Sequence, residues 1–154
     1  HAIKAFKRIE FQDRDYLPEV LPEIIECYQR LNQDKKLGLY LEYLLQQSPS
    51  ISIVLANAKN IKESKGKAIA AQFLTKYLQK FPSVRGLKTL IEYHLVELKT
   101  ELKSEWVMLQ EYVEKLLDKK PVYQCRHCGF SGKTLLWQCP SCRNWASVKP
   151  LSHE

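Results

Sequence analysis

Two Cys-x-x-Cys pairs in the last third of the sequence constrain this chain more than any other feature. Cys125 and Cys128 form the first pair, and Cys139 and Cys142 form the second, with ten residues between the inner cysteines. Each pair places two sulfurs on one tight turn, and a hairpin brings the two turns to face each other. Gly129 follows the first pair, where the backbone of such a turn often takes a positive φ. The pattern therefore predicts a metal site with four thiolate ligands.

The ion expected in this site is Zn²⁺ or iron, because a tetrahedral set of four sulfurs accepts both. His127 lies inside the first turn and would be a ligand only if a cysteine were displaced. Four thiolates leave no coordination position for water or substrate, so a zinc ion held in this way is structural. The alternative is two reactive dithiols or a pair of disulfides, which leaves the symmetry of the two turns unexplained.

The residues around the cysteines are expected to form a small ribbon, with residues 134–138 as its returning strand. A module of this size has little core of its own. We therefore expect its aromatic side chains to pack on the ribbon or against the last helix. These side chains are Tyr123, Phe130, Trp137 and Trp145. Base stacking on exposed rings is the alternative.

Residues 1–120 show helical periodicity and almost no strand pattern. The expected helices cover residues 2–12, 18–31, 36–47, 51–64, 67–80, 84–99 and 104–117. Gly66 is suited to end the fourth of these, and Ser104 to cap the start of the seventh. Pro121 ends the helical part. The sequence thus predicts a helical domain over residues 1–120 and a metal-binding module over residues 121–154.

A weak internal repeat runs through the helical part. Residues 40–50 (YLEYLLQQSPS) resemble residues 73–83 (FLTKYLQKFPS) at an offset of 33 residues, and Pro49 aligns with Pro82. A period near 34 built from helix pairs is typical of tetratricopeptide repeats. An ordinary helical bundle with chance similarity is the alternative. In the repeat register, His94 takes a helix-packing position, and residues 2–12 take the place of a second helix. We therefore expect the chain to be the C-terminal piece of a longer array.

Composition limits the classes of function. The hydrophobic fraction of 45% supports a folded core, and the formal charge of +7 falls to about +5 with four thiolates and a divalent ion. Basic and acidic residues are interleaved along the helices, so a solvated surface is favoured over a nucleic-acid stripe. Clustered cysteines suit a reducing compartment. No stretch approaches the roughly 20 apolar residues that span a bilayer.

No catalytic constellation is recognisable, so we expect the chain not to be an enzyme. Cys27 stands apart from the other cysteines beside an apolar helix face, where a small packing residue is favoured over a nucleophile. In the repeat register, four basic residues face the concave groove of the array and would receive an acidic segment of a partner. They are Lys59, Lys62, Arg85 and Lys88. Ordinary solvated side chains are the alternative for these residues.

The stretch from Tyr123 to Pro150 (YQCRHCGFSGKTLLWQCPSCRNWASVKP) closely resembles the C-terminal end of the lipopolysaccharide assembly protein B family. Members of this family combine a tetratricopeptide array with a rubredoxin-like metal module. The stretches AFKRIEFQD, near the start of the chain, and IEYHL, at residues 91–95, also resemble this family in their order along the sequence. The resemblance implies that Cys125, Cys128, Cys139 and Cys142 hold the metal. The loop between the cysteine pairs is shorter than in free-standing rubredoxins, which argues against electron transfer.

The resemblance also implies partners and a location. It implies an adaptor at the cytoplasmic face of the Gram-negative inner membrane, with an N-terminal anchor outside this chain. The adaptor would bind the inner-membrane AAA+ metalloprotease and promote its degradation of the deacetylase of the lipid A pathway, which limits lipopolysaccharide synthesis. A lipopolysaccharide-sensing inner-membrane protein is a further implied partner. A one-electron redox module and a nucleic-acid-binding zinc ribbon are the alternative functions. Residues 121–154 contain only four Lys and Arg residues, which argues against the nucleic-acid-binding ribbon.

Overall fold

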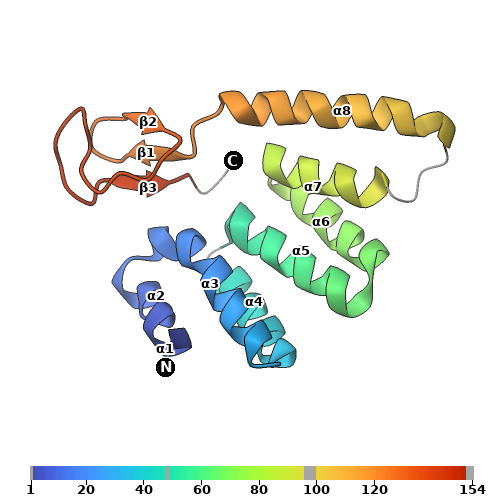
Figure 1. Ribbon diagram of the computed structural model, residues 1–154, viewed down its shortest axis with the longest axis horizontal. Helices are drawn as coiled ribbons and strands as arrows, with labels where there is room; N and C mark the ends of the chain where they lie inside the picture. Colours follow the sequence, from blue (N-terminus) through green and yellow to red (C-terminus); the bar gives the residue numbers. More distant parts are fainter. Residues whose placement is uncertain (1, 48, 96–99, 152–154) are drawn as a thin grey trace. The chain divides into compact units, whose positions relative to one another are not determined.

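The computed structural model describes residues 2–47, 49–95 and 100–151 (Figure 1). The chain forms two compact units, and most contacts of each unit are between its own residues. The first, here called the clamp unit, joins residues 2–43 to residues 121–151. The second, here called the helical unit, covers residues 44–120 apart from the positions left out above.

The clamp unit begins with helical segments. They are α1 (Ala2–Lys7), α2 (Ile9–Gln12), the 3₁₀ turn η1 (Arg14–Tyr16) and α3 (Leu17–Arg30), followed by α4 (Asp34–Gln47), which continues into the helical unit. The single helix expected over residues 2–12 is therefore two short helices. The side chain of Asp13 accepts a hydrogen bond from the backbone N–H of Asp15 and caps η1. Pro22 lies inside α3.

Apolar residues at helical spacing bury one face of α3. Leu17, Leu21, Ile24 and Tyr28 lie at intervals of three and four residues and are all buried.

One acidic residue of the clamp unit, in α2, is also buried. Glu10 is 6% exposed and accepts a hydrogen bond from the hydroxyl of Tyr40. Burial, followed by this hydrogen bond, raises the pKa of Tyr40.

The helical unit consists of α5 (Ile51–Lys65), α6 (Lys67–Lys80), α7 (Val84–Leu95) and α8 (Thr100–Lys119), each packed on the next. Ser50 caps α5 by accepting the N–H of Ile53, and Gly66, at φ 94°, ends it as expected. The core contains Val54, Ala58, Ala70 and Leu74, all with 0% exposure. A Cβ on Gly86 would lie 2.5 Å from a methyl group of Leu78, so the absence of a side chain allows α7 to approach α6 closely.

The helix boundaries repeat at a nearly constant interval. Helices α4 and α6 start at Asp34 and Lys67, and helices α5 and α7 start at Ile51 and Val84, so the starts in each pair are 33 residues apart. The structure thus confirms a mostly α-helical repeat array of tetratricopeptide type. The expected start of α8 at Ser104 is wrong, because the helix already includes Thr100 and Ser104 lies inside it. Residues 96–99, expected to continue α7, lie outside the described residues.

The C-terminal module is a three-stranded antiparallel sheet in the order β2-β1-β3 (Figure 1). The strands are β1 (Tyr123–Cys125), β2 (Ser131–Gly132) and β3 (Val148–Pro150). Tyr123 pairs with Gly132 on one side and with Pro150 on the other. The expected returning strand over residues 134–138 is wrong, since β3 returns instead and only Gln138 makes an isolated bridge, to Trp145. None of the helices in the described ranges has the length and apolar character needed to cross a bilayer.

Candidate metal centre

The two cysteine pairs form two turns with the same backbone pattern. In the first, the N–H of Gly129 donates to the carbonyl of Cys125 at 3.0 Å, and Gly129 takes a φ of 78°. In the second, the N–H of Arg143 donates to the carbonyl of Cys139 at 2.9 Å, and Arg143 takes a φ of 60°. Both turns therefore end in a residue of left-handed conformation, which glycine adopts without steric cost.

The four sulfur atoms converge on one point. They all lie within 4.8 Å of one another, with 3.7 Å between Cys125 and Cys142 and 3.6 Å between Cys128 and Cys139. A tetrahedral ion with metal–sulfur bonds of about 2.3 Å requires sulfur–sulfur distances of about 3.8 Å. The cluster therefore fits one thiolate-bound metal ion. Cys27 is not part of this cluster.

Burial differs among the four cysteines. Cys125 is 2% exposed and Cys139 is 0% exposed, whereas Cys128 is exposed and Cys142 is half-buried. Burial raises the pKa of the Cys139 thiol to about 11, which disfavours its thiolate in the absence of a cation. The bound ion supplies the positive charge that a buried thiolate needs.

Hydrogen bonds favour the thiolate form of Cys125 and Cys128. A hydrogen bond between Ser147 and the sulfur of Cys125, at 3.3 Å, lowers the pKa of that thiol to about 6. The backbone N–H of Phe130 lowers the pKa of Cys128. The side-chain amide of Asn144 donates to the sulfur of Cys142 at 3.5 Å. Sequence reasoning missed Asn144 and Ser147. They lie two and five residues after Cys142, and no motif marks either of them.

The aromatic residues of the module take different positions. Tyr123 and Phe130 pack against the buried group formed by Cys125, Cys139 and Val148. The ring of Trp137 lies 5.3 Å from the ring of Tyr16, although Trp137 remains 59% exposed. Trp145, which was expected to pack, is instead 72% exposed, although its backbone forms a bridge with Gln138.

The module is attached to the N-terminal segment of the clamp unit by polar contacts. The hydroxyl of Tyr16 donates to the carbonyl of Val148 at 3.2 Å, and Lys149 forms an ion pair with Asp13. The hydroxyl of Tyr123 donates to the carboxylate of Glu19 at 2.9 Å. The sequence analysis expected the aromatic side chains to pack on the ribbon or against the last helix and did not anticipate these contacts. Nothing local marks residues 13–19 as the counterpart of a segment more than 100 residues away.

The four basic residues expected to face the groove lie on α5 and α7, and several have partners. Lys88 forms an ion pair with Glu114 of α8 at 3.2 Å, and its hydrogen bond lowers the pKa of Glu114. The guanidinium of Arg85 donates to Ser52 at 3.2 Å. The ammonium of Lys62 lies 5.2 Å from the centre of the Tyr93 ring, and Lys59 is exposed. His94 contacts the next helix through Trp106, with 6.0 Å between the rings.

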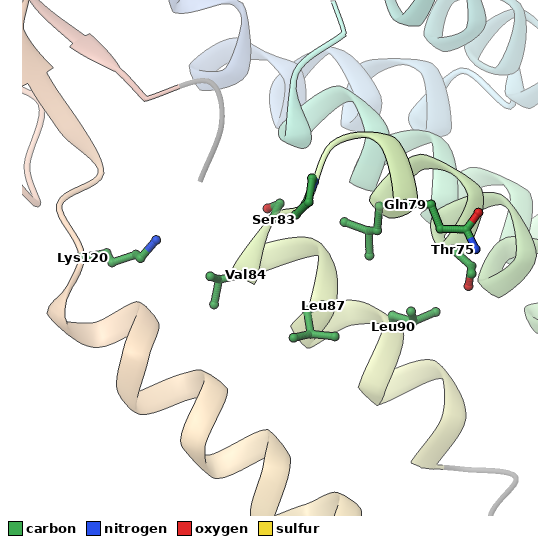
Figure 2. A pocket seen from close by; sticks show the side chains of 9 residues that line it. Thr75, Gln79, Ser83, Val84, Leu87, Leu90 and Lys120 are labelled. Carbon is green, nitrogen blue, oxygen red and sulfur yellow. The ribbon is translucent and has the colours of Figure 1, made fainter.

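The helical unit also holds an apolar cavity of about 460 Å³ between the end of α6, the start of α7 and the end of α8. Figure 2 shows Val84, Leu87 and Leu90 along the side formed by α7 and Lys120 near the end of α8. The described lining is mostly apolar, with Lys120 as its one charged residue.

Comparison with known proteins relates both parts of the chain to characterised sequences. Residues 123–150 match the family described as the rubredoxin metal binding domain. The chain is 32% identical over 151 residues to lipopolysaccharide assembly protein B of Escherichia coli K12, an alignment covering 97% of this chain and 39% of that protein. The Haemophilus influenzae protein of the same name is 32% identical over 154 residues, with 99% and 39% coverage. The chain therefore spans about two fifths of the length of these relatives.

Proposed function

We propose that this chain, a relative of lipopolysaccharide assembly protein B over 97% of its length, is part of a non-enzymatic adaptor in lipopolysaccharide synthesis. One observation carries the proposal: the four sulfurs lie within 4.8 Å of one another and close on a single point. A metal ion with four protein ligands has no position for a substrate. Its contribution is therefore to the fold, and the function falls to the protein surfaces that the fold presents.

The proposed ligands of the ion are Cys125, Cys128, Cys139 and Cys142, and the ion is Zn²⁺ or iron. When bound, it supplies the charge that keeps all four sulfurs deprotonated and so fixes both turns. Other residues of the chain support the site. Ser147 and Asn144 form hydrogen bonds with the sulfurs of Cys125 and Cys142, and Tyr123 and β3 form hydrogen bonds with residues 13–19. The redox alternative predicts a reversible one-electron wave, and a colourless zinc protein would exclude it.

The proposed action is presentation of a substrate to a protease. The adaptor binds the inner-membrane AAA+ metalloprotease and the deacetylase of the lipid A pathway, and it promotes degradation of the deacetylase. A lipopolysaccharide-sensing inner-membrane protein is its proposed regulator, and the cytoplasmic face of the inner membrane is its proposed location. The names of the relatives support the pathway, and the helical repeats support the mode of action, because stacked helix pairs present extended binding surfaces.

The proposal is tested by measuring the binding of the purified deacetylase and the purified protease to this chain. We expect the metal-loaded chain to bind the deacetylase and the protease, and we expect Cys139→Ser combined with Cys142→Ser to weaken this binding by at least about tenfold because the ribbon unfolds. Cys27→Ser is the matched control, since it removes a cysteine outside the cluster. Equal binding by the double variant and the wild type would disprove the role of the metal, and binding of neither protein by the wild type would disprove the adaptor function. Metal analysis of protein purified from its own source identifies the ion.

A further inference from the structure

The most exposed large aromatic side chain of the metal module is Trp145, at 72% exposure. Its backbone is held on both sides. Gln138 forms a bridge with Trp145, and the N–H of Ala146 donates to the carbonyl of Trp137 at 2.7 Å. The indole is thus presented from a fixed backbone beside the metal centre. An indole has only two rotatable side-chain bonds, so it loses little conformational entropy when a partner covers it.

The second tryptophan of the module provides a contrast. Trp137 has an intramolecular counterpart in Tyr16, with 5.3 Å between the rings. Among the described residues, no ring contact or hydrogen bond is found for the side chain of Trp145. Trp137 is therefore among the residues that attach the ribbon to the N-terminal segment, whereas the indole of Trp145 makes no such contact.

Two basic residues lie close to Trp145 along the backbone: the N–H of Arg126 donates to the carbonyl of Ser147 at 2.8 Å, and Arg143 lies two residues before Trp145 in the sequence. Arg126, His127 and Arg143 are exposed, and the segment 121–151 contains no Asp or Glu. Lys149 is engaged by Asp13, whereas neither the Arg126 nor the Arg143 guanidinium has an ion pair within the described part of the chain. Even with the two negative charges of a tetrathiolate–metal centre, this surface is suited to carboxylates, which arginine binds with two parallel hydrogen bonds.

The backbone at Arg143 points the same way. Arg143 occupies in the second turn the left-handed position that Gly129 occupies in the first, at φ 60° and 78°. A side chain in this conformation costs roughly 1 kcal/mol relative to glycine. The turn itself is satisfied by glycine, as the first turn shows, so the fold alone does not explain an arginine there. Ala146 also takes a positive φ, of 51°, so the strain marks the segment around Trp145 and not Arg143 alone, and strain of this kind accompanies functional positions.

We propose that Arg126, Arg143 and Trp145, here called the knuckle face, form a docking site for an acidic segment of a partner protein. Trp145 is the apolar anchor, and the two arginines pair with carboxylates of the partner. Nucleic acid fits less well, because stacked single strands need several aromatic platforms and a row of phosphate contacts. The inference deepens the proposed adaptor function, on which it rests only for the identity of the partner.

Chemical-shift mapping on the full, zinc-loaded chain tests the site with a defined probe. The probe is a 12-residue peptide of Asp, Glu and one Leu, at physiological ionic strength, with a Lys-rich peptide as the negative control. We expect saturable shifts at the Trp145 indole N–H and at the amides of Arg126 and Arg143. Shifts confined to Lys59, Lys62, Arg85 and Lys88, no saturable shifts, or tighter binding of a single-stranded RNA to the same face would overturn the proposal.

Variants separate specific docking from general attraction of charge. Trp145→Ala and Arg143→Gly should each weaken peptide binding by about tenfold or more. Arg143→Gly keeps the conformation that the turn requires, so metal content and thiolate absorption should not change. Lys133→Gln is the matched control, because it removes one charge from an exposed residue of the same module. An equal loss of affinity in Lys133→Gln would overturn the proposal.

The same variants keep this inference distinguishable from the proposed function. If the wild type binds the deacetylase or the protease, and Trp145→Ala and Arg143→Gly bind as well as the wild type does, the knuckle face is wrong and the adaptor function stands. If the wild type binds neither protein but the acidic peptide maps to the knuckle face, the adaptor function is wrong and the docking site stands.

Discussion

The metal module and the helical unit achieve a defined fold by different physical means. The helical unit buries side chains such as Val54, Ala58 and Leu74 completely, at helical spacing along α5 and α6. Its stability therefore comes from apolar surface removed from water. The module has strands of two or three residues, and its buried group consists largely of two metal-ligand cysteines and Val148. A core of this size does not offset the loss of conformational entropy on folding.

The difference shows what each kind of sequence signal specifies. In the helical unit the buried apolar surface is spread over many positions, so the repeat persists although its copies differ in sequence. In the module four side chains carry most of the stabilisation, and the remaining positions are left for surface chemistry. This freedom is consistent with a strained Arg143 and an exposed Trp145 in the smaller part of the molecule.

Removal of the metal should produce the largest effect and should affect only one side of this comparison. Binding of structural zinc contributes on the order of 10 kcal/mol in small zinc modules, more than the remaining core of the ribbon supplies. We expect Cys139→Ser, or a strong chelator, to collapse the amide dispersion of residues 121–151. The helical circular dichroism should remain, because α5–α8 hold no ligand of the site.

Cys27→Ser controls for the loss of a thiol and should retain the metal and the dispersed spectrum. If the amides of the ribbon keep their dispersion without a bound ion, the module has a core that the buried group around Val148 does not reveal. Loss of the α5–α8 signals would show instead that the metal also supports the helical unit.

Truncation of a core side chain should have the converse effect. Leu74 is 0% exposed and packs with Ile51 and Val54, so Leu74→Ala should lower the free energy of unfolding of the helical unit by about 2–5 kcal/mol. Urea titration followed by helical circular dichroism measures the loss, while metal content should stay at one ion per chain.

Leu116→Ala is the matched control in the same unit. Leu116 is 54% exposed, so its truncation should change the free energy of unfolding by less than about 0.5 kcal/mol. Equal effects of the two substitutions would contradict the assignment of the core.

The sequence predicted the features that depend on local pattern. The cysteine spacing indicated the convergence of four sulfurs, and helical periodicity with a 33-residue offset indicated the array. Ser104 shows where local signals mislead, because this good capping residue lies inside α8, which already includes Thr100. Residues 134–138 were wrong for a similar reason, since their apolar run resembles a strand but the sheet is completed by Val148–Pro150.

The contacts that join distant segments could not be predicted in this way. The pairing of Asp13 with Lys149 spans 136 positions, and no local pattern around either residue points to the other. Such contacts depend on which surfaces meet after both parts have folded, and one sequence carries no record of that pairing. The same holds for Ser147, whose effect on Cys125 arises from the turn geometry and not from spacing between cysteines.

The smallest expected effect concerns the hydrogen bond that joins the module to α3. Burial, with a further contribution from the Glu19 carboxylate, raises the pKa of Tyr123 to about 12 from an ordinary value of 10.0. A raised tyrosine pKa means that the fold favours the neutral phenol, so this stabilisation is complete below pH 10 and is lost between pH 10 and pH 12.

Tyr123→Phe removes the donor to Glu19 and should cost about 1 kcal/mol at neutral pH. The difference between wild type and variant, measured by urea titration of the metal-loaded chain, should shrink across that interval. Tyr112→Phe is the control, because Tyr112 is 53% exposed on α8 and should show no such trend. A difference that stays constant from pH 8 to pH 12 would mean that the hydroxyl of Tyr123 does not help to hold the ribbon on α3, and that the attachment depends on Tyr16 and Lys149 alone.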